Sequence, residues 1–290
     1  MENKFLHTLL ETKCLKNSLY SILKHSFLYH SNKIEGSTFT TESLALLLDK
    51  NVVTGKHTLD DVQETVNSSY VFDTIVETLG TKINHSFLKN IHSSLMFNTT
   101  LHAKGFSGIY KTIPNMIIGT DTKVAQPFEV EPKLDELFEW YYSLENVTLD
   151  DIAEFHYRFE LIHPFQDGNG RIGRILIPLY LFDKKILRNA NFFVSESLEK
   201  DKFKYYQLLN NTRVVITDEE DNKEQYLKDM QTAKNNFTEW VEFFLESCIK
   251  QCDKDLEKID AIDSLYEKIS DKAKELIRTP GILQVIDLIF

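Results

Sequence analysis

The chain has 290 residues, of which 42% are hydrophobic and 27% are charged, and this balance excludes a generally disordered protein. Its formal net charge of −11 argues against nucleic-acid binding, which needs a basic face. The sequence has neither the roughly 18-residue apolar run of a membrane span nor a signal-peptide core, so we expect a cytoplasmic protein with no membrane partner.

Glycine and proline are scarce, with 10 and 6 residues, and most segments repeat hydrophobic residues with the period of an α-helix. The chain should therefore be mainly helical. In chain order, we expect helices over residues 4–28, 31–35, 40–49, 58–79, 84–97, 131–143, 149–162, 171–186, 195–213, 223–247 and 251–278. Short β-prone runs at 108–111 and 113–119, broken by Gly and Pro-Asn, predict a hairpin.

The most informative stretch is the run 163–174, which reads HPFQDGNGRIGR. Pro164 disfavours a helical backbone at His163, so a helix should end there. The Gly-Asn-Gly sequence at 168–170 can turn so that its backbone N–H groups point into one concavity that binds anions. The apolar residues after it start a new helix, whose N-terminus favours phosphate.

Two arginines, a carboxylate and a histidine complete a polyphosphate site in this run. Arg171 and Arg174 are three residues apart, so they are neighbours on one helical face and can bind phosphate oxygens with their planar guanidinium groups. Asp167 offers an oxygen ligand suited to Mg²⁺, which usually takes one or two carboxylates together with substrate phosphates. His163 titrates near neutrality and can accept a proton.

The run resembles the signature of the Fic family, H-x-F-x-[DE]-G-N-G-R-x-x-R, and matches it at every specified position. The resemblance implies a Fic-type helical bundle with a small β-hairpin flap beside the active site. It implies transfer of AMP from ATP, with Mg²⁺ or Mn²⁺, to a hydroxyl side chain (Ser, Thr or Tyr) of a protein target. It is also compatible with self-modification and with a homodimer.

The same resemblance implies a role for each residue of the run. His163 would be the general base on the target hydroxyl, Phe165 an apolar anchor of the loop, and Asp167 the metal ligand. The groups that bind the phosphates of ATP would come from Gly168, Asn169, Gly170, Arg171 and Arg174, with Arg174 on the γ-phosphate. A Fic relative that phosphorylates its target has lysine at the position of Gly170, so glycine here favours nucleotidyl transfer.

A second motif, SNKIEG at residues 31–36, resembles the inhibitory motif [ST]-x-x-x-E-[GN] of many Fic proteins. Ser31 and Glu35 are four apart and share a helix face, and Gly36 can end that helix. The resemblance implies that Glu35 pairs with Arg174 and occupies the guanidinium that the γ-phosphate needs, because charge-assisted pairs of this kind are strong and directional. We therefore expect autoinhibition.

Two further segments resemble parts of Fic proteins. The run 108–119 resembles the flap that aligns the target as an added strand, although lysine stands where arginine is common. Its flap residues would be Tyr110, Lys111, Ile117 and Ile118. The run 205–213 resembles the lining of the adenine pocket, with Tyr206, Leu209 and Arg213 on one helical stripe.

The resemblance also indicates a division of the chain. Residues 1–80 would form an N-terminal helical lobe that carries the inhibitory motif, and 81–247 the Fic core, with an insert near 214–236. Residues 248–290 would be a C-terminal helical extension. Because many Fic proteins of this type continue into a winged-helix module at this point, the resemblance is also compatible with the truncated start of such a module.

Two alternatives to adenylylation stay open at this stage. The same site could remove AMP from a protein, alone or in a bifunctional enzyme, with Glu35 aligning a water. A nucleotide-sensing regulatory protein would bind ATP without turnover, but pure binding does not need the base at His163.

Overall fold

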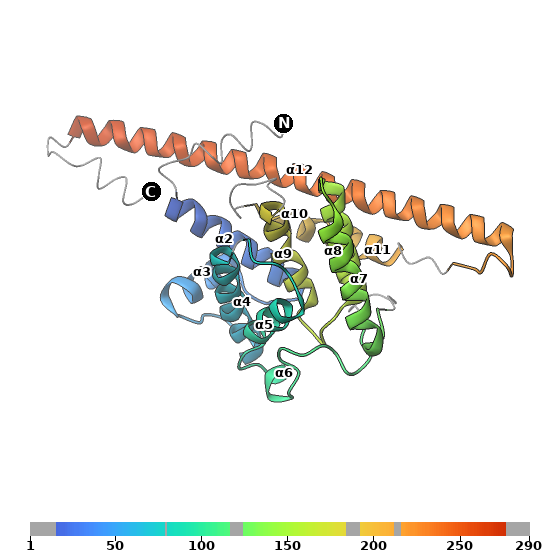
Figure 1. Ribbon diagram of the computed structural model, residues 1–290. Coiled ribbons are helices and arrows are strands. Elements are labelled where there is room, and N and C mark those ends of the chain that lie inside the picture. Colours follow the sequence, from blue (N-terminus) through green and yellow to red (C-terminus); the bar gives the residue numbers. More distant parts are fainter. Residues whose placement is uncertain (1–15, 79, 117–123, 184–191, 212–215, 277–290) are drawn as a thin grey trace.

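The computed structural model describes residues 16–78, 80–116, 124–183, 192–211 and 216–276, and Figure 1 shows these residues as a mainly helical protein. The predicted fold class is confirmed. The helices are α2 (Lys16–Ile34), α3 (Thr41–Lys50), α4 (Leu59–Glu77), α5 (His85–Leu95), α6 (Thr100–Ala103), the 3-10 helix η1 (Pro127–Glu129), α7 (Val130–Ser143), α8 (Leu149–Ile162), α9 (Asn169–Asp183), α10 (Ser195–Lys200), α11 (Lys202–Asn211) and α12 (Lys223–Leu276).

Side-chain caps fix where several of these helices begin. Thr40, Thr58, Asn84 and Thr148 stand just before α3, α4, α5 and α8, and each side chain accepts a hydrogen bond from the backbone N–H three residues further on. Such caps satisfy one of the N–H groups that a helix start leaves without a partner. The predicted starts of these four helices are therefore confirmed to within one residue.

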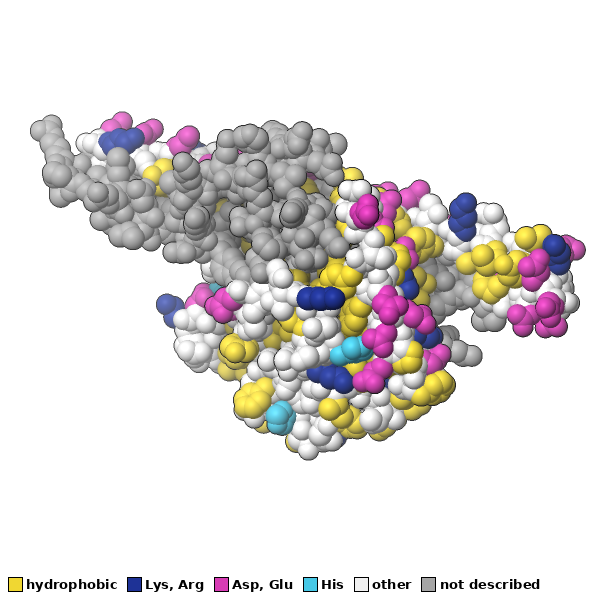
Figure 2. Space-filling view, in the orientation of Figure 1, with side chains coloured by type: hydrophobic (Ala, Val, Ile, Leu, Met, Phe, Trp, Pro, Cys, Tyr) yellow, Lys and Arg dark blue, Asp and Glu magenta, His cyan; other side chains and the backbone are white. Residues whose placement is uncertain are grey.

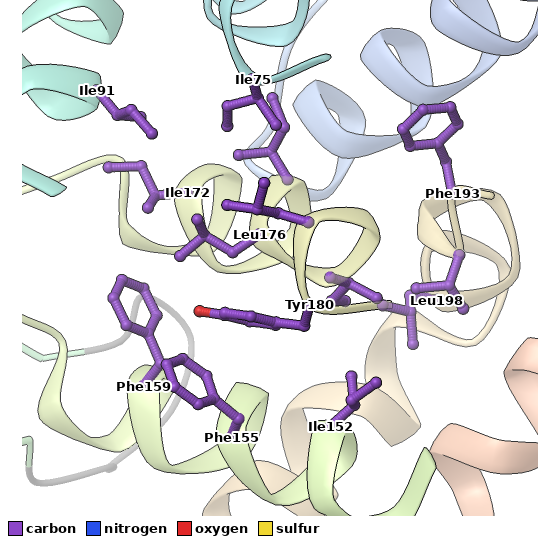
Figure 3. Close-up of a cluster of buried hydrophobic side chains, with 14 of the residues drawn as sticks. Ile75, Ile91, Ile152, Phe155, Phe159, Ile172, Leu176, Tyr180, Phe193 and Leu198 are labelled. Atoms are coloured by element: carbon purple, nitrogen blue, oxygen red, sulfur yellow. The ribbon is translucent and has the colours of Figure 1, made fainter. Parts of the chain in front are cut away.

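Helix α9 lies at the centre of the protein. Its residues from Arg171 to Leu181 are all buried, as expected of a helix that is apolar on every side. Figure 3 shows Ile172, Leu176 and Tyr180 of α9 between α4 and α5 on one side and α8 on the other. The Gly-Asn-Gly turn at 168–170 thus leads into a helix that is buried from Arg171 to Leu181.

The N-terminal helix α2 packs against α9 and α10, and so brings the run 31–36 close to the run 163–174. The ring of Phe27 on α2 lies 5.4 Å from that of Phe72 on α4 and 5.1 Å from that of Phe193, just before α10. These three rings belong to the main hydrophobic core. The end of α2 is therefore held against the start of α9.

Three of the predicted helix boundaries are wrong. The predicted break between 28 and 31 is absent, because α2 runs on to Ile34. The predicted helix 195–213 is interrupted at Asp201. The carbonyl of this residue accepts a hydrogen bond from the Tyr205 N–H at 2.9 Å, at the beginning of α11. The predicted helices 223–247 and 251–278 are one helix, α12, since no glycine or proline interrupts the sequence between 223 and 276. The domain limits placed at 80 and 247 stay predictions, and α12 crosses the second without a break.

Helix α12 packs against α8, α10 and α11 and extends beyond the body at both ends (Figure 1). In the part of the face that Figure 2 describes, basic side chains lie singly among acidic ones. Among the helices in the described ranges, none is both long and apolar enough to cross a membrane.

The predicted hairpin is not seen in the described residues. Between 108 and 116 only Met116 is assigned to a strand-like bridge. Ile117 and Ile118, on the second predicted run, lie outside the described residues, so the flap stays a prediction.

Candidate active site around the Fic signature

His163 lies directly after the last residue of α8, as the sequence predicts. Its backbone is left-handed, with φ 48° and ψ 61°, and its N–H donates to the carbonyl of Phe159 at 3.0 Å. Such a conformation is costly for a residue with a Cβ and is typical of functional sites. The imidazole is 13% exposed, so it can be reached from outside while it stays largely enclosed.

Phe165 anchors the loop, as predicted. Its side chain is fully buried and its ring stacks on that of His92 at a centroid distance of 3.9 Å. The Asn169 side chain closes the turn, because its Oδ1 accepts from the Phe165 N–H at 2.7 Å and its Nδ2 donates to the Phe165 carbonyl at 2.8 Å. The Asn169 amide is therefore engaged with the loop backbone in this structure.

The glycines leave room that no other residue would. Gly168 has φ +77°, and a Cβ there would overlap the Met96 side chain. A Cβ at Gly170 would overlap Oε1 of Glu35 and lie 2.8 Å from Nη1 of Arg174. The turn therefore leads into the N-terminus of α9 with its backbone close to the carboxylate of Glu35.

Arg174 pairs with both residues of the predicted inhibitory motif. Its Nη2 lies 2.6 Å from Oε1 of Glu35, its Nε donates to Ser31 Oγ at 3.1 Å, and Nη2 also donates to the Ser31 carbonyl at 3.0 Å. The guanidinium is 1% exposed. Burial alone would raise the pKa of Glu35, but the charges of Arg174 and Arg171 outweigh it and lower that pKa. Glu35 is thus ionised at neutral pH.

Arg171 has a partner that the sequence analysis missed. Its Nη1 lies 2.5 Å from Oε2 of Glu64 on α4, and its Nη2 lies 3.8 Å from Oδ1 of Asp167. Burial raises the pKa of Glu64 despite the opposing charge of Arg171. Nothing in the sequence around Glu64 marks it, because the contact joins residues 107 positions apart.

Two more buried groups next to the loop were also missed. Gly108 donates its N–H to Nδ1 of His92, so the proton of this histidine sits on Nε2 and is donated to the Asp167 carbonyl at 3.2 Å. Burial lowers the pKa of His92 to about 3, so the ring is neutral. Oε2 of Glu160 lies 3.9 Å from Nδ1 of His163, and burial raises the pKa of Glu160 to about 8. At neutral pH Glu160 is therefore mainly a neutral acid beside His163.

Two of the three residues predicted for the adenine pocket, Tyr206 and Leu209, lie one turn apart on α11, and the pocket itself stays a prediction. Tyr206 donates its hydroxyl to the Ile34 carbonyl at 3.4 Å, which places it beside the inhibitory motif. Leu209 is buried in the hydrophobic core. Arg213 lies outside the described residues.

A cavity of about 220 Å³ opens between the end of α2 and the start of α4. Its lining includes Arg171 and four acidic residues, Glu35, Asp60, Asp61 and Glu64. The cavity beside Arg171 is therefore mainly acidic.

Asp167 is the carboxylate of the signature, and its side chain is 56% exposed. Its Oδ1 accepts from the Gly168 N–H at 2.5 Å. Within the described ranges, no three His, Cys, Asp or Glu side chains form a group that could hold a metal ion. This donor set fits Mg²⁺, which commonly takes one carboxylate and completes its shell with phosphates and water.

Residues 82–181 match the family model described as Fic/DOC family, and the chain therefore carries a Fic domain. Over 193 residues it is 29% identical to "Protein adenylyltransferase Fic" of Nematostella vectensis, which covers 63% of this chain and 42% of the relative. It is 25% identical over 162 residues to "Protein adenylyltransferase fic-1" of Caenorhabditis briggsae, covering 53% and 31%. The chain thus spans less than half the length of these curated relatives.

The fold is similar to that of solved Fic proteins. The crystal structure of a Fic domain containing signaling protein from Bacteroides thetaiotaomicron superposes with a TM-score of 0.68 at 22% identity, over 90% of this chain and 97% of that one. This likeness extends well beyond the matched domain. The likeness therefore concerns the fold of most of this chain.

Proposed function

We propose that this chain is a protein adenylyltransferase that moves AMP from ATP to a Ser, Thr or Tyr hydroxyl of a protein. The observation that carries the proposal is the single loop that places a histidine, an exposed aspartate and a glycine turn ahead of two buried arginines. The names of the curated relatives support the same reaction class.

In this reaction His163 takes the proton of the target hydroxyl. The hydroxyl oxygen then bonds to the α-phosphorus of ATP, the bond to the bridging β-phosphate oxygen breaks, and pyrophosphate leaves. The backbone N–H groups at 168–170 and the positive end of α9 stabilise the phosphate charge. Arg171 and Arg174 bind the β- and γ-phosphates once their carboxylate partners are displaced.

Asp167 would hold Mg²⁺ or Mn²⁺ together with the phosphates of ATP, and the ion would neutralise phosphate charge. Because this chain offers the ion one exposed carboxylate, metal affinity should rise when nucleotide is bound. A protein target and ATP are then the partners of the site.

We also propose that Glu35 restrains the enzyme. Its carboxylate occupies the Arg174 guanidinium, which a γ-phosphate would otherwise bind. Oε1 of Glu35 also lies where a Cβ at position 170 would be, beside the anion-binding turn at 168–170. ATP that binds in its presence cannot use Arg174 to align the α-phosphate.

The test compares transfer of label from α-³²P-ATP and γ-³²P-ATP to the Glu35→Gly protein itself. We expect label from the α-phosphate, and a loss of about 10²- to 10⁴-fold in His163→Ala, since that is the usual contribution of a general base. Label from the γ-phosphate would indicate a kinase-like transfer instead.

A nucleotide sensor would bind a non-hydrolysable ATP analogue and label nothing. Wild-type-like labelling by His163→Ala would remove this residue from the mechanism. Release of AMP from prelabelled protein would favour the de-adenylylase alternative.

A further inference from the structure

Lys111 contacts the backbone on both sides of His163. Its ammonium donates to the carbonyl of Ile162 at 3.2 Å, and its backbone N–H donates to the carbonyl of Pro164 at 2.9 Å. Ile162 and Pro164 are the residues immediately before and after the histidine. One residue from the start of the predicted flap therefore bonds the carbonyls of the residues immediately before and after the proposed base.

Asn115 extends this contact along the loop. Its Nδ2 donates to the carbonyl of Phe165 at 2.8 Å, and lies 3.4 Å from that of Gln166. Its Oδ1 accepts from the Lys111 ammonium at 2.9 Å, which links the two side chains. Together they reach the carbonyls of four residues around His163.

The position of the Lys111 ammonium is chemically specific. It is 2% exposed and lies at the C-terminus of α8, where the last carbonyls lack helical partners and the helix dipole is negative. A cation is favoured there. Burying a flexible ammonium is costly unless it is hydrogen-bonded, so its bonds to Ile162 and Asn115 explain why it stays inside.

We propose that Lys111 and Asn115 are positioning residues that hold His163 in its left-handed conformation and so aim the imidazole at the target hydroxyl. This inference rests on the proposed function for the identity of the reaction. It assigns Lys111 to the catalytic loop rather than to the target segment. The anion-binding turn at 168–170 lies beyond the residues whose carbonyls Lys111 and Asn115 bond. Losing these hydrogen bonds, which we call the brace, should therefore affect proton transfer more than nucleotide binding.

The kinetic test uses Lys111→Met and Asn115→Ala in the Glu35→Gly background. We expect the turnover of self-labelling to fall about 10- to 100-fold, which is the effect of a displacement near 1 Å, with the KM for ATP changed less than about twofold. Lys111→Arg should retain most of the turnover, because a guanidinium can donate to the same two oxygens. The matched control is Lys104→Met, at an exposed lysine away from the loop, which should change neither constant.

A second measurement does not depend on transfer. Hydrogen exchange should become faster in peptides covering 161–169 of Lys111→Met and Asn115→Ala, and stay unchanged in peptides of α7 and α12. Unchanged exchange in the loop of both variants, or a rise in the KM for ATP with turnover unaffected, would overturn the brace. Absence of labelling in Glu35→Gly itself would instead count against the proposed function, while the exchange result would still decide the brace.

Discussion

Replacing Glu35 by glutamine keeps the size of the side chain and removes its charge, so it tests the proposed inhibitory pair directly. Glu35 makes one charge-assisted bond of 2.6 Å to Arg174. Such bonds contribute about 1.5–3 kcal/mol, and about 1.4 kcal/mol corresponds to a tenfold change, so releasing the arginine should raise self-labelling about 10- to 150-fold. The neutral bond of Ser31 contributes about 0.5–1.5 kcal/mol, which predicts a smaller gain of about 2- to 12-fold in Ser31→Ala.

The assay is the rate of self-labelling from α-³²P-ATP at saturating nucleotide. Glu42→Gln, at an exposed carboxylate on α3, is the matched control for loss of one negative charge and should behave as wild type. Arg174→Ala should be inactive with either residue at position 35, because the γ-phosphate then has no partner in both. Equal labelling of the wild type and Glu35→Gln, with His163→Ala inactive in both backgrounds, would refute the inhibitory reasoning.

Three further predictions follow from the site. Excess chelator and Asp167→Ala should both reduce self-labelling of Glu35→Gly sharply, and undiminished labelling in chelator would make this carboxylate structural. Alanine usually stabilises a helix relative to glycine, but a Cβ at Gly173 would overlap Glu160 and lie 3.2 Å from Phe159. Urea unfolding should therefore show Gly173→Ala to be about 1–3 kcal/mol less stable, and a more stable variant would show that Glu160 moves aside. Since burial raises the pKa of Glu160 from 4.5 to about 8, the folded state binds this proton more tightly than the unfolded state. The unfolding free energy of the wild type should thus fall as pH rises from about 4.5 to 8. Glu160→Gln should become increasingly more stable than the wild type across that window. A difference in unfolding free energy that does not change with pH would contradict this reasoning.

The signature and the helix starts could be predicted because the relevant information is local. The residues of the run 163–174 are contiguous, so their order along the chain already fixes which of them lie close together. Pro164 ends α8 and the glycine at 168 starts the turn, both through backbone geometry that belongs to those residues. The caps of α3, α4, α5 and α8 are likewise set by single polar side chains.

Helix ends without such a signal could not be predicted. The sequence between 223 and 276 has no breaker, and whether a helix continues there depends on what it packs against, which is α8, α10 and α11. At Asp201 the chain shows the opposite behaviour to α12. The hydrophobic residues keep the period of a helix through this region, but α10 ends at Asp201, a residue type suited to capping, and α11 begins after it. The left-handed backbone of His163, and the lysine that braces it, depend on a segment about fifty residues away.

Of the two carboxylates that pair with Arg174 and Arg171, one could be predicted from the sequence and the other could not. Glu35 was found because it belongs to a recognisable short motif, whereas Glu64 stands in α4 with nothing around it to distinguish it from a solvated charge. Both carboxylates lie before residue 82, where the match to the Fic/DOC family begins, while both arginines lie inside it. The packing of Phe27 on Phe72 joins α2, which ends one residue before Glu35, to α4, which carries Glu64. A comparison confined to residues 82–181 would therefore recover Arg171 and Arg174 without the acids that pair with them in this structure.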